Sequence, residues 1–149
     1  MNSRTFVFIR MLQEIKLASY IENYGENWAD NLPAGCPPED VCIANEDVFF
    51  RMTFEVDSIQ PKDWYNHLAL FPERIFSDSE KLFAAGLSLL DTIEEVERKR
   101  KLPGTKHLKG TARISLVPED GVVLQTGRRV HHFTWWRTTM CNLSKAQIV

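Results

Sequence analysis

The sequence lacks most of the features that would assign it to a specialised class of protein. Its 149 residues include only seven glycines and three cysteines, Cys36, Cys42 and Cys141. An odd number of widely spaced cysteines predicts reduced thiols rather than a disulfide framework. Cys36 and Cys42 do not have the spacing of a zinc ribbon, and no histidine lies near them in sequence, so no metal site is predicted.

Long apolar runs are also missing. No stretch approaches the ~20 apolar residues that a membrane-spanning helix needs, and residues 1–9 lack the apolar core and cleavage site of a signal peptide. The sequence therefore predicts a cytoplasmic protein without a membrane partner. Its length, with 44% hydrophobic and 26% charged residues, is typical of one globular domain.

The motifs of the common enzyme classes are absent as well. The sequence contains no Walker loop, no dinucleotide-binding glycine pattern, no HExxH and no GxSxG. No cofactor is therefore predicted. These absences favour a non-enzymatic function without excluding the rarer enzyme classes.

Several segments have the pattern of β-strands. Residues 48–55, 109–116, 122–124 and 130–136 are predicted to form strands of one sheet, and residues 86–90 a further short strand with Ser88 on one face. The Pro-Glu-Asp-Gly sequence at 118–121 predicts a chain reversal before the strand 122–124. In the strand 48–55, Phe50 is expected on the core face and Arg51 on the more polar face.

Two longer helices are predicted beside these strands. Residues 9–24 have apolar side chains about every three residues, which predicts an amphipathic helix that ends near Gly25. Residues 92–101 begin with the capping-box pair Thr92 and Glu95, and their acidic start and basic end match the helix dipole. The proline-rich residues 32–44 predict an ordered loop.

These elements together predict an α+β fold with a mainly antiparallel sheet packed by two or three helices. We expect a single domain over residues 1–149, with a helical extension at 1–30, a core at 31–137 and a tail at 138–149. The residues predicted to lie in the hydrophobic core are Phe50, Met52, Phe54, Leu87, Leu89, Ile114, Leu116 and Phe133.

Charge is distributed unevenly along the chain. Residues 1–97 contain 7 Lys and Arg against 18 Asp and Glu, whereas residues 98–149 contain 11 against 2. Such a distribution indicates either that an acidic half folds against a basic half or that a basic face meets an anionic partner. The first interpretation is favoured, because two halves of a small domain must pack together.

Five motifs carry a resemblance to known sequences. They are LPAGCPPED at 32–40, FFR at 49–51, GLS at 86–88, PEDGVVLQTG at 118–127 and HHFTWW at 131–136. Together they resemble a group of small bacterial proteins to which no activity is assigned. The resemblance implies a bacterial cytoplasmic protein and covers about residues 31–137, so that the N-terminal helix lies outside it.

The favoured hypothesis for function is an accessory module that binds a protein partner. Its predicted binding surface contains Arg51, Arg129, His132 and Trp136. If Arg51 and His132 share a face of the sheet with threonines, that face is costly to bury unless a polar partner meets it. Arginine beside large aromatic rings is also the composition of a binding hot spot.

Two other hypotheses stay open, together with the oligomeric state. The first is nucleic-acid binding, in which a tryptophan stacks on a base while basic side chains contact phosphates. Those side chains are Arg98, Lys99, Arg100, Lys101, Arg128 and Arg129. The second is an enzyme cleft containing Arg51, Ser88 and His132, in which the first two faintly resemble the arginine and serine of ADP-ribosyltransferase-like folds. The catalytic glutamate of those folds has no counterpart, because no Asp or Glu follows Asp120.

Overall fold

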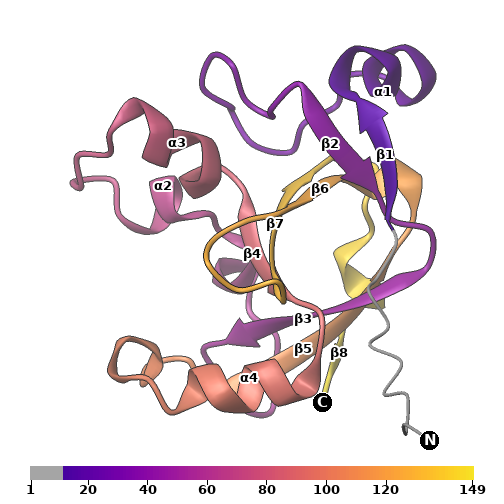
Figure 1. Cartoon of the computed structure of the whole chain (residues 1–149). Helices are drawn as coiled ribbons and strands as arrows, with labels where there is room; N and C mark the ends of the chain where they lie inside the picture. The colour runs from indigo at the N-terminus through magenta and orange to yellow at the C-terminus, as the bar shows by residue number, and fades with distance from the viewer. Residues whose placement is uncertain (1–11) are drawn as a thin grey trace, which may run out of the picture.

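A single antiparallel sheet of eight strands organises the chain (Figure 1). The computed structural model describes residues 12–149. The strands lie side by side in the order β1-β2-β6-β7-β4-β3-β5-β8. In chain order they are β1 Gln13–Lys16, β2 Asp40–Ile43, β3 Asp47–Thr53, β4 Leu87–Leu90, β5 Gly110–Leu116, β6 Gly121–Gln125, β7 His132–Arg137 and β8 Gln147–Ile148.

Short helices lie around this sheet. The α-helices are α1 Leu17–Tyr24, α2 His67–Leu70, α3 Asp78–Ala84 and α4 Ile93–Arg100, and the 3₁₀ helices are η1 Pro61–Trp64, η2 Pro103–Thr105, η3 Pro118–Asp120 and η4 Leu143–Lys145. Figure 1 shows α1 at one end of the sheet, α4 at the other, and α2 with α3 to one side. No helix within residues 12–149 has the length and apolar character that crossing a bilayer requires. The predicted α+β class with an antiparallel sheet is confirmed.

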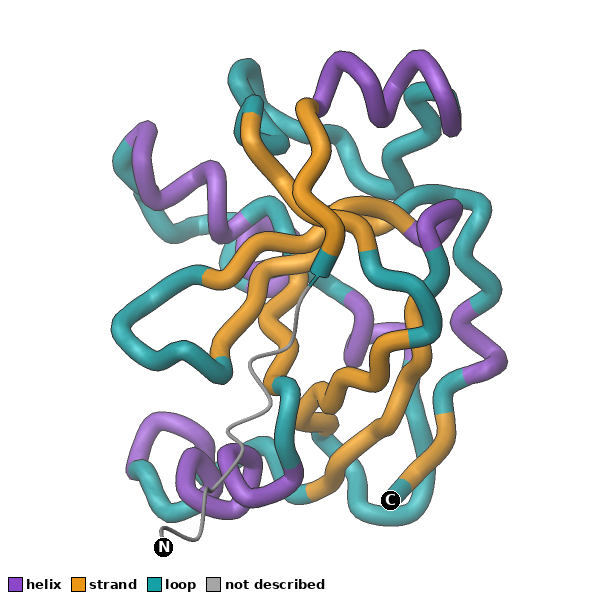
Figure 2. The backbone as a smooth tube through the Cα atoms, turned by 45° about the vertical axis from the view of Figure 1, so that its right-hand side comes forward, coloured by secondary structure: helices purple, strands orange, loops and turns teal. Residues whose placement is uncertain are grey.

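The sheet curls so that its inner face encloses the main hydrophobic core (Figure 2). Of the residues predicted to be buried, Leu87, Leu89, Ile114, Leu116 and Phe133 lie in this core. Phe49, Trp64, Val123 and Trp135 join them, and the Phe49 and Phe133 rings meet edge to face at 5.4 Å between centroids. The five strands predicted from the sequence all belong to this one sheet.

The predicted orientation of β3 is wrong. Phe49, not Phe50, enters the main core and is fully buried, and Arg51 points to the same side of the strand as Phe49. Phe50 and Met52 face outward and pack with Val96 of α4 in a separate cluster, and Phe54 lies just beyond the strand, partly buried. Because both faces of β3 are covered, alternation alone could not identify the face that meets the main core.

The N-terminal helix is shorter than predicted. Within the described residues, Gln13–Lys16 form β1, which pairs with β2, and the helix α1 begins only at Leu17. The first residues of the predicted helix 9–24 lie outside the described part. Its end is as predicted, because Gly25 has φ +86 and caps α1. The predicted loop 32–44 contains β2, whose Cys42 pairs with Val123 of β6.

Helix α4 begins as the capping-box pattern predicts, although only half of the box forms. The Thr92 hydroxyl oxygen accepts a hydrogen bond from the Glu95 backbone N–H at 3.1 Å. The Glu95 carboxylate does not accept the second hydrogen bond of the box, from the Thr92 backbone N–H, because it accepts hydrogen bonds from Arg98 and Arg129 instead. Through Val96, α4 packs on Met52 of β3 and Leu90 of β4.

The two neighbouring phenylalanines of β3 should differ in their effect on stability. Phe49→Ala should lower the free energy of unfolding by about 3–5 kcal/mol, because it leaves a cavity in the main core. Phe50→Ala should cost clearly less, because that ring is only partly buried and lines a pocket. Urea denaturation of both variants measures the difference, and equal losses would contradict the assigned faces.

Candidate functional site

A pocket of about 700 Å³ opens between the outer face of the sheet, α2 and α4. Strands β3 and β4 form its floor, and the chain after α4 forms one wall. The side chains around it include apolar groups and cations in close proximity. Its lining residues are Phe50, Arg51, Met52, Phe54, His67, Leu70, Phe71, Ser88, Leu90, Lys99, Gly104, Thr105, His107 and Leu108.

The wall beside α4 is fixed by hydrogen bonds within the protein. The Thr105 hydroxyl donates to the Lys99 carbonyl at 2.7 Å, which ties η2 to the end of α4. The Arg100 guanidinium donates to the Leu108 carbonyl at 2.7 Å and to the Gly110 carbonyl at 3.3 Å. These bonds hold Lys99, Thr105 and Leu108 at the pocket.

Arg51 lies where β3 and β4 separate. These two strands pair at Phe50 and Leu90. Beyond this pair, the Arg51 guanidinium donates to the carbonyls of Ser88 at 2.9 Å, of Tyr65 at 3.2 Å and of Asp63. Burial lowers the pKa of Arg51 to about 10, against the nearby negative charge of Asp63, so the group stays charged at neutral pH.

Ser88, His132 and Thr134 share the outer face of the sheet. Ser88 of β4 lies directly opposite Thr134 of β7, and Leu90 opposite His132. Thr126 Oγ1 is 3.0 Å from His132 Nδ1 and 2.8 Å from Thr134 Oγ1, so the imidazole is held in place from the β6–β7 loop. Arg51 and Ser88 line the pocket, whereas His132 does not, and the side chains of Arg51 and His132 leave their strands on opposite faces of the sheet, so the shared face expected from the sequence is not found.

The electrostatic environment of the pocket is positive. Among the described residues that line it, none is an aspartate or a glutamate. Burial lowers the pKa of His67, and the positive charges of Arg51, Arg74 and Lys99 lower it further. Burial also lowers the pKa of Lys99, with Arg98 adding to the effect, and burial together with Lys99 lowers the pKa of His132. The positive charges of Arg51 and Lys99 therefore reach the His67 side chain within the pocket.

Of the residues of the predicted protein-binding surface, Trp136 is buried and Arg129 is half-exposed but bound to Glu95. Trp136 is 1% exposed, and its Nε1 donates to the Leu82 carbonyl at 3.0 Å. Arg129 is bound to Glu95 by two hydrogen bonds, one of them 2.9 Å long. The Trp136 indole packs with the buried residues Tyr20 and Val122 in a cluster separate from the main core. Protein therefore covers this side of β7 at Trp136.

The basic residues of the nucleic-acid hypothesis are divided among several roles. Arg98 and Arg129 bind Glu95, and Arg100 binds the backbone carbonyls that follow η2. Lys99 lines the pocket. Lys101 and Arg128 are exposed, together with Lys106 and Lys109. Glu95 of the acidic half thus binds two arginines of the basic half, while four other basic residues stay exposed.

Sequence reasoning missed three ionisable residues of the pocket: His67, Lys99 as a pocket residue, and His107. His67 and His107 stand beside aromatic residues, Phe71 and Phe54, at centroid distances of 5.8 and 5.9 Å. The only sequence signal was the presence of histidine at both positions in loop-rich segments. Their convergence depends on how residues 61–71 and 103–109 fold onto the sheet.

Replacing Glu95 should change how stability depends on pH. The hydrogen bond from Arg129 is the main reason that the pKa of Glu95 falls to about 2, with Arg98 also lowering it and burial opposing both. An acid with a lowered pKa in the folded state stabilises the protein above its unfolded pKa, and that contribution is lost as the pH falls toward 2. Glu95→Gln should lower the free energy of unfolding by about 1.5–3 kcal/mol at pH 7.

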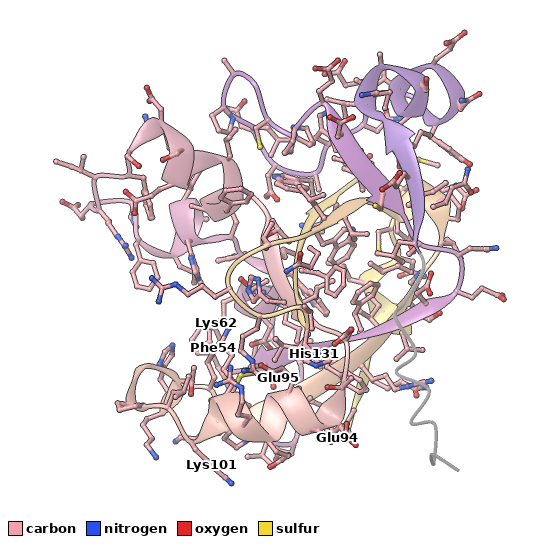
Figure 3. The ribbon with its side chains drawn as sticks, in the orientation of Figure 1. Phe54, Lys62, Glu94, Glu95, Lys101 and His131 are labelled. Atoms are coloured by element: carbon pink, nitrogen blue, oxygen red, sulfur yellow. The ribbon has the colours of Figure 1, made fainter. Side chains whose placement is uncertain are left out.

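The same variant should flatten the decline in stability between about pH 4.5 and pH 2, since the neutral amide has no proton to gain. Urea titrations at pH 6 and pH 3 measure this slope. Glu94→Gln is the matched control, because Glu94 is exposed on the other side of α4 (Figure 3). If the two variants have the same pH dependence, the proposed role of the Glu95 ion pairs is excluded.

Comparisons with known proteins found no family for this chain. The chain matches no protein-family model, no curated protein and no solved structure. A proposal for its function therefore depends on the residues of the pocket and on the surfaces around it.

Proposed function

We propose that the protein binds a small organic anion with a planar apolar group, in the pocket between β3, β4, α2 and α4. The observation that supports this most strongly is the charge of the lining. Arg51 and Lys99 lie around a space that, among the described residues, has no carboxylate in its lining. In a partly dehydrated pocket, such cations attract an anion more strongly than they would in water.

Apolar side chains provide the second part of the proposal. Phe50, Phe54, Leu90 and Leu108 line the same pocket, so a ligand with a flat hydrophobic body would bury apolar surface against them. Its volume lies within the range of pockets that enclose small molecules. A metabolite-sized ligand is therefore favoured over an extended one.

Polar side chains without a partner would make the pocket specific for an anion. Within residues 12–149, neither Lys99 Nζ nor Ser88 Oγ has a hydrogen-bonding partner or an ion pair. Both side chains are half-buried, so a bound anion would satisfy groups that water reaches poorly. Charge-assisted hydrogen bonds from such donors are the stronger kind. Arg51 would contribute mainly its charge, because three of its N–H groups already bind carbonyls.

This proposal keeps two residues of the enzyme hypothesis and omits its reaction. Arg51 and Ser88 line the pocket as that hypothesis requires, and His132 lies on the next strand. A transferase of the ADP-ribosylating kind needs a catalytic carboxylate, and none of the described residues lining the pocket supplies it. Binding is therefore the activity that these residues support.

Removing the Lys99 charge should weaken binding of an aromatic anion. With 1-naphthyl phosphate as the probe, Lys99→Ala should raise the Kd about tenfold, which corresponds to about 1.4 kcal/mol. Lys101→Ala is the matched control, because Lys101 is exposed and lies on the far side of α4 from Phe54 (Figure 3). Isothermal titration calorimetry gives both constants.

A neutral analogue tests the importance of charge directly. 1-Naphthol should bind at least tenfold more weakly than 1-naphthyl phosphate, and raising the salt concentration should weaken only the phosphate. Equal binding of the two probes, or no binding of either at millimolar concentration, would contradict the proposal.

A protein partner is the second proposal, and one observation favours it. Residues 65–83 expose four large apolar side chains, of which Ile75 is 94% exposed, and they lie on the part of the chain that contains α2 and α3. The four are Tyr65, Phe71, Ile75 and Phe83. Exposed apolar patches are typical of interaction surfaces. We therefore propose a partner surface beside α2 and α3, rather than at the buried Trp136.

The partner surface can be tested by comparing two substitutions in a pull-down. Ile75→Asp should abolish the recovery of any specific partner, because it places a charge in the centre of the proposed apolar contact. Val130→Asp is the matched control, since Val130 is also exposed but lies in the β6–β7 loop. If both variants recover the same proteins as the wild type, with unchanged Tm, the surface at α2 and α3 is excluded.

A further inference from the structure

We infer that the organic anion of the proposed pocket is a free nucleoside monophosphate, with its base between two pairs of aromatic rings and its phosphate at Lys99 and Ser88. This inference rests on the proposed binding function and narrows its ligand class. Three observations support it. They are the aromatic rings that line the pocket, the ring nitrogens that have no hydrogen-bonding partner among residues 12–149, and the contacts of the surrounding arginines.

The pocket contains two ring pairs contributed by different parts of the chain. Phe54, at the end of β3, lies 5.9 Å from His107, with an angle of 48° between the rings. His67 and Phe71, from α2 and the residue that follows it, lie 5.8 Å apart at 64°. All four rings line the same space. A planar base has two faces on which such rings can stack, and stacking is tolerant of base identity.

Each ring pair includes a histidine, and this favours a heterocycle over a hydrocarbon ring. A neutral imidazole carries one N–H donor and one nitrogen acceptor. Among residues 12–149, neither the His67 ring nor the His107 ring has a hydrogen-bonding partner in the protein. A nucleobase presents donors and acceptors along its edges, whereas a phenyl or naphthyl group presents none.

The same pocket also holds groups that suit a phosphate. Among residues 12–149, Lys99 Nζ and Ser88 Oγ are donors without a partner, and the charge of Arg51 reaches the pocket, because it lowers the pKa of both His67 and Lys99. A dianionic phosphate gains more from several positive groups than a single carboxylate does. The hydroxyl and ammonium donors differ in reach, so they can bind different oxygens of one phosphate.

The same ligand chemistry occurs at the 5′ end of a nucleic acid strand, and the structure favours the free nucleotide. A strand would need cations along its backbone beyond the first phosphate. Arg98 and Arg129 are instead bound to Glu95, and Arg100 is bound to the carbonyls of Leu108 and Gly110. Lys62, whose Nζ lies 4.4 Å from the Phe54 ring centroid (Figure 3), is exposed, as are Lys106 and Lys109 in the segment that forms the pocket wall.

Calorimetry with a panel of defined probes tests the inference on the full-length protein. The probes are AMP, GMP, CMP and UMP, with adenosine, ribose 5-phosphate and 1-naphthyl phosphate as partial ligands and a 5′-phosphorylated oligonucleotide as the strand end. At least one nucleotide should bind tenfold more tightly than adenosine, ribose 5-phosphate and 1-naphthyl phosphate. The oligonucleotide should bind no more tightly than that nucleotide.

Two isosteric substitutions separate recognition of the base from stacking alone. His67→Phe and His107→Phe keep an aromatic ring and remove the ring nitrogens, so at least one should weaken nucleotide binding fivefold or more. Neither should weaken 1-naphthyl phosphate, which offers no edge to hydrogen-bond. Unchanged Tm values for both variants exclude a general loss of structure as the cause.

The outcomes distinguish this inference from the function on which it rests. If 1-naphthyl phosphate binds as tightly as every nucleotide, or if both histidine variants bind nucleotides normally, the nucleotide inference is overturned and organic-anion binding stands. If no anionic probe binds, both are overturned. If the oligonucleotide binds more tightly than the free nucleotides, the ligand is a strand end and the inference of a free nucleotide is overturned.

Discussion

The hydrogen bonds of the Arg51 guanidinium join parts of the fold that backbone pairing leaves apart. Strands β3 and β4 pair at Phe50 and Leu90, and past that point Arg51 donates to the Ser88 carbonyl of the neighbouring strand. It also donates to the carbonyls of Asp63 and Tyr65, which holds the chain around η1 against the sheet. The gap between β3 and β4, and with it part of the pocket floor, is therefore bridged by a side chain rather than by a ladder of backbone bonds.

Glu95 connects the charge pattern of the sequence with the same region. Its buried carboxylate binds Arg98 on its own helix and Arg129 from the β6–β7 loop. Loss of either arginine would leave the buried Glu95 carboxylate with less compensating positive charge, which costs free energy of folding. Both arginines are therefore expected to stay bound to Glu95. Lys99, the next residue in the basic run, has no such partner among the described residues and lines the pocket. Within the basic run, Lys99 therefore contributes its charge to the pocket, whereas Arg98 is bound to Glu95.

Local patterns predicted the sheet better than they predicted the site. The strands β3, β5, β6 and β7 and the start of α4 follow from alternation, turn residues and the Thr92 cap. Strand β2 was not predictable because Pro37 and Pro38 precede it closely, and the face of β3 was ambiguous because α4 covers the side opposite the main core. His67 and Lys99 meet only through tertiary packing, so no spacing in the sequence indicates their proximity.

The strand order also has a consequence for how the protein folds. The centre of the sheet is made by β7, whose partners are β4 and β6, and β4 ends at Leu90 whereas β7 begins only at His132. Most neighbouring strands are thus far apart in sequence, which is the property that slows folding in β-rich domains. A chain emerging from the ribosome would expose the inner faces of β3 and β4, including Phe49 and Leu89, until β7 arrives to cover them.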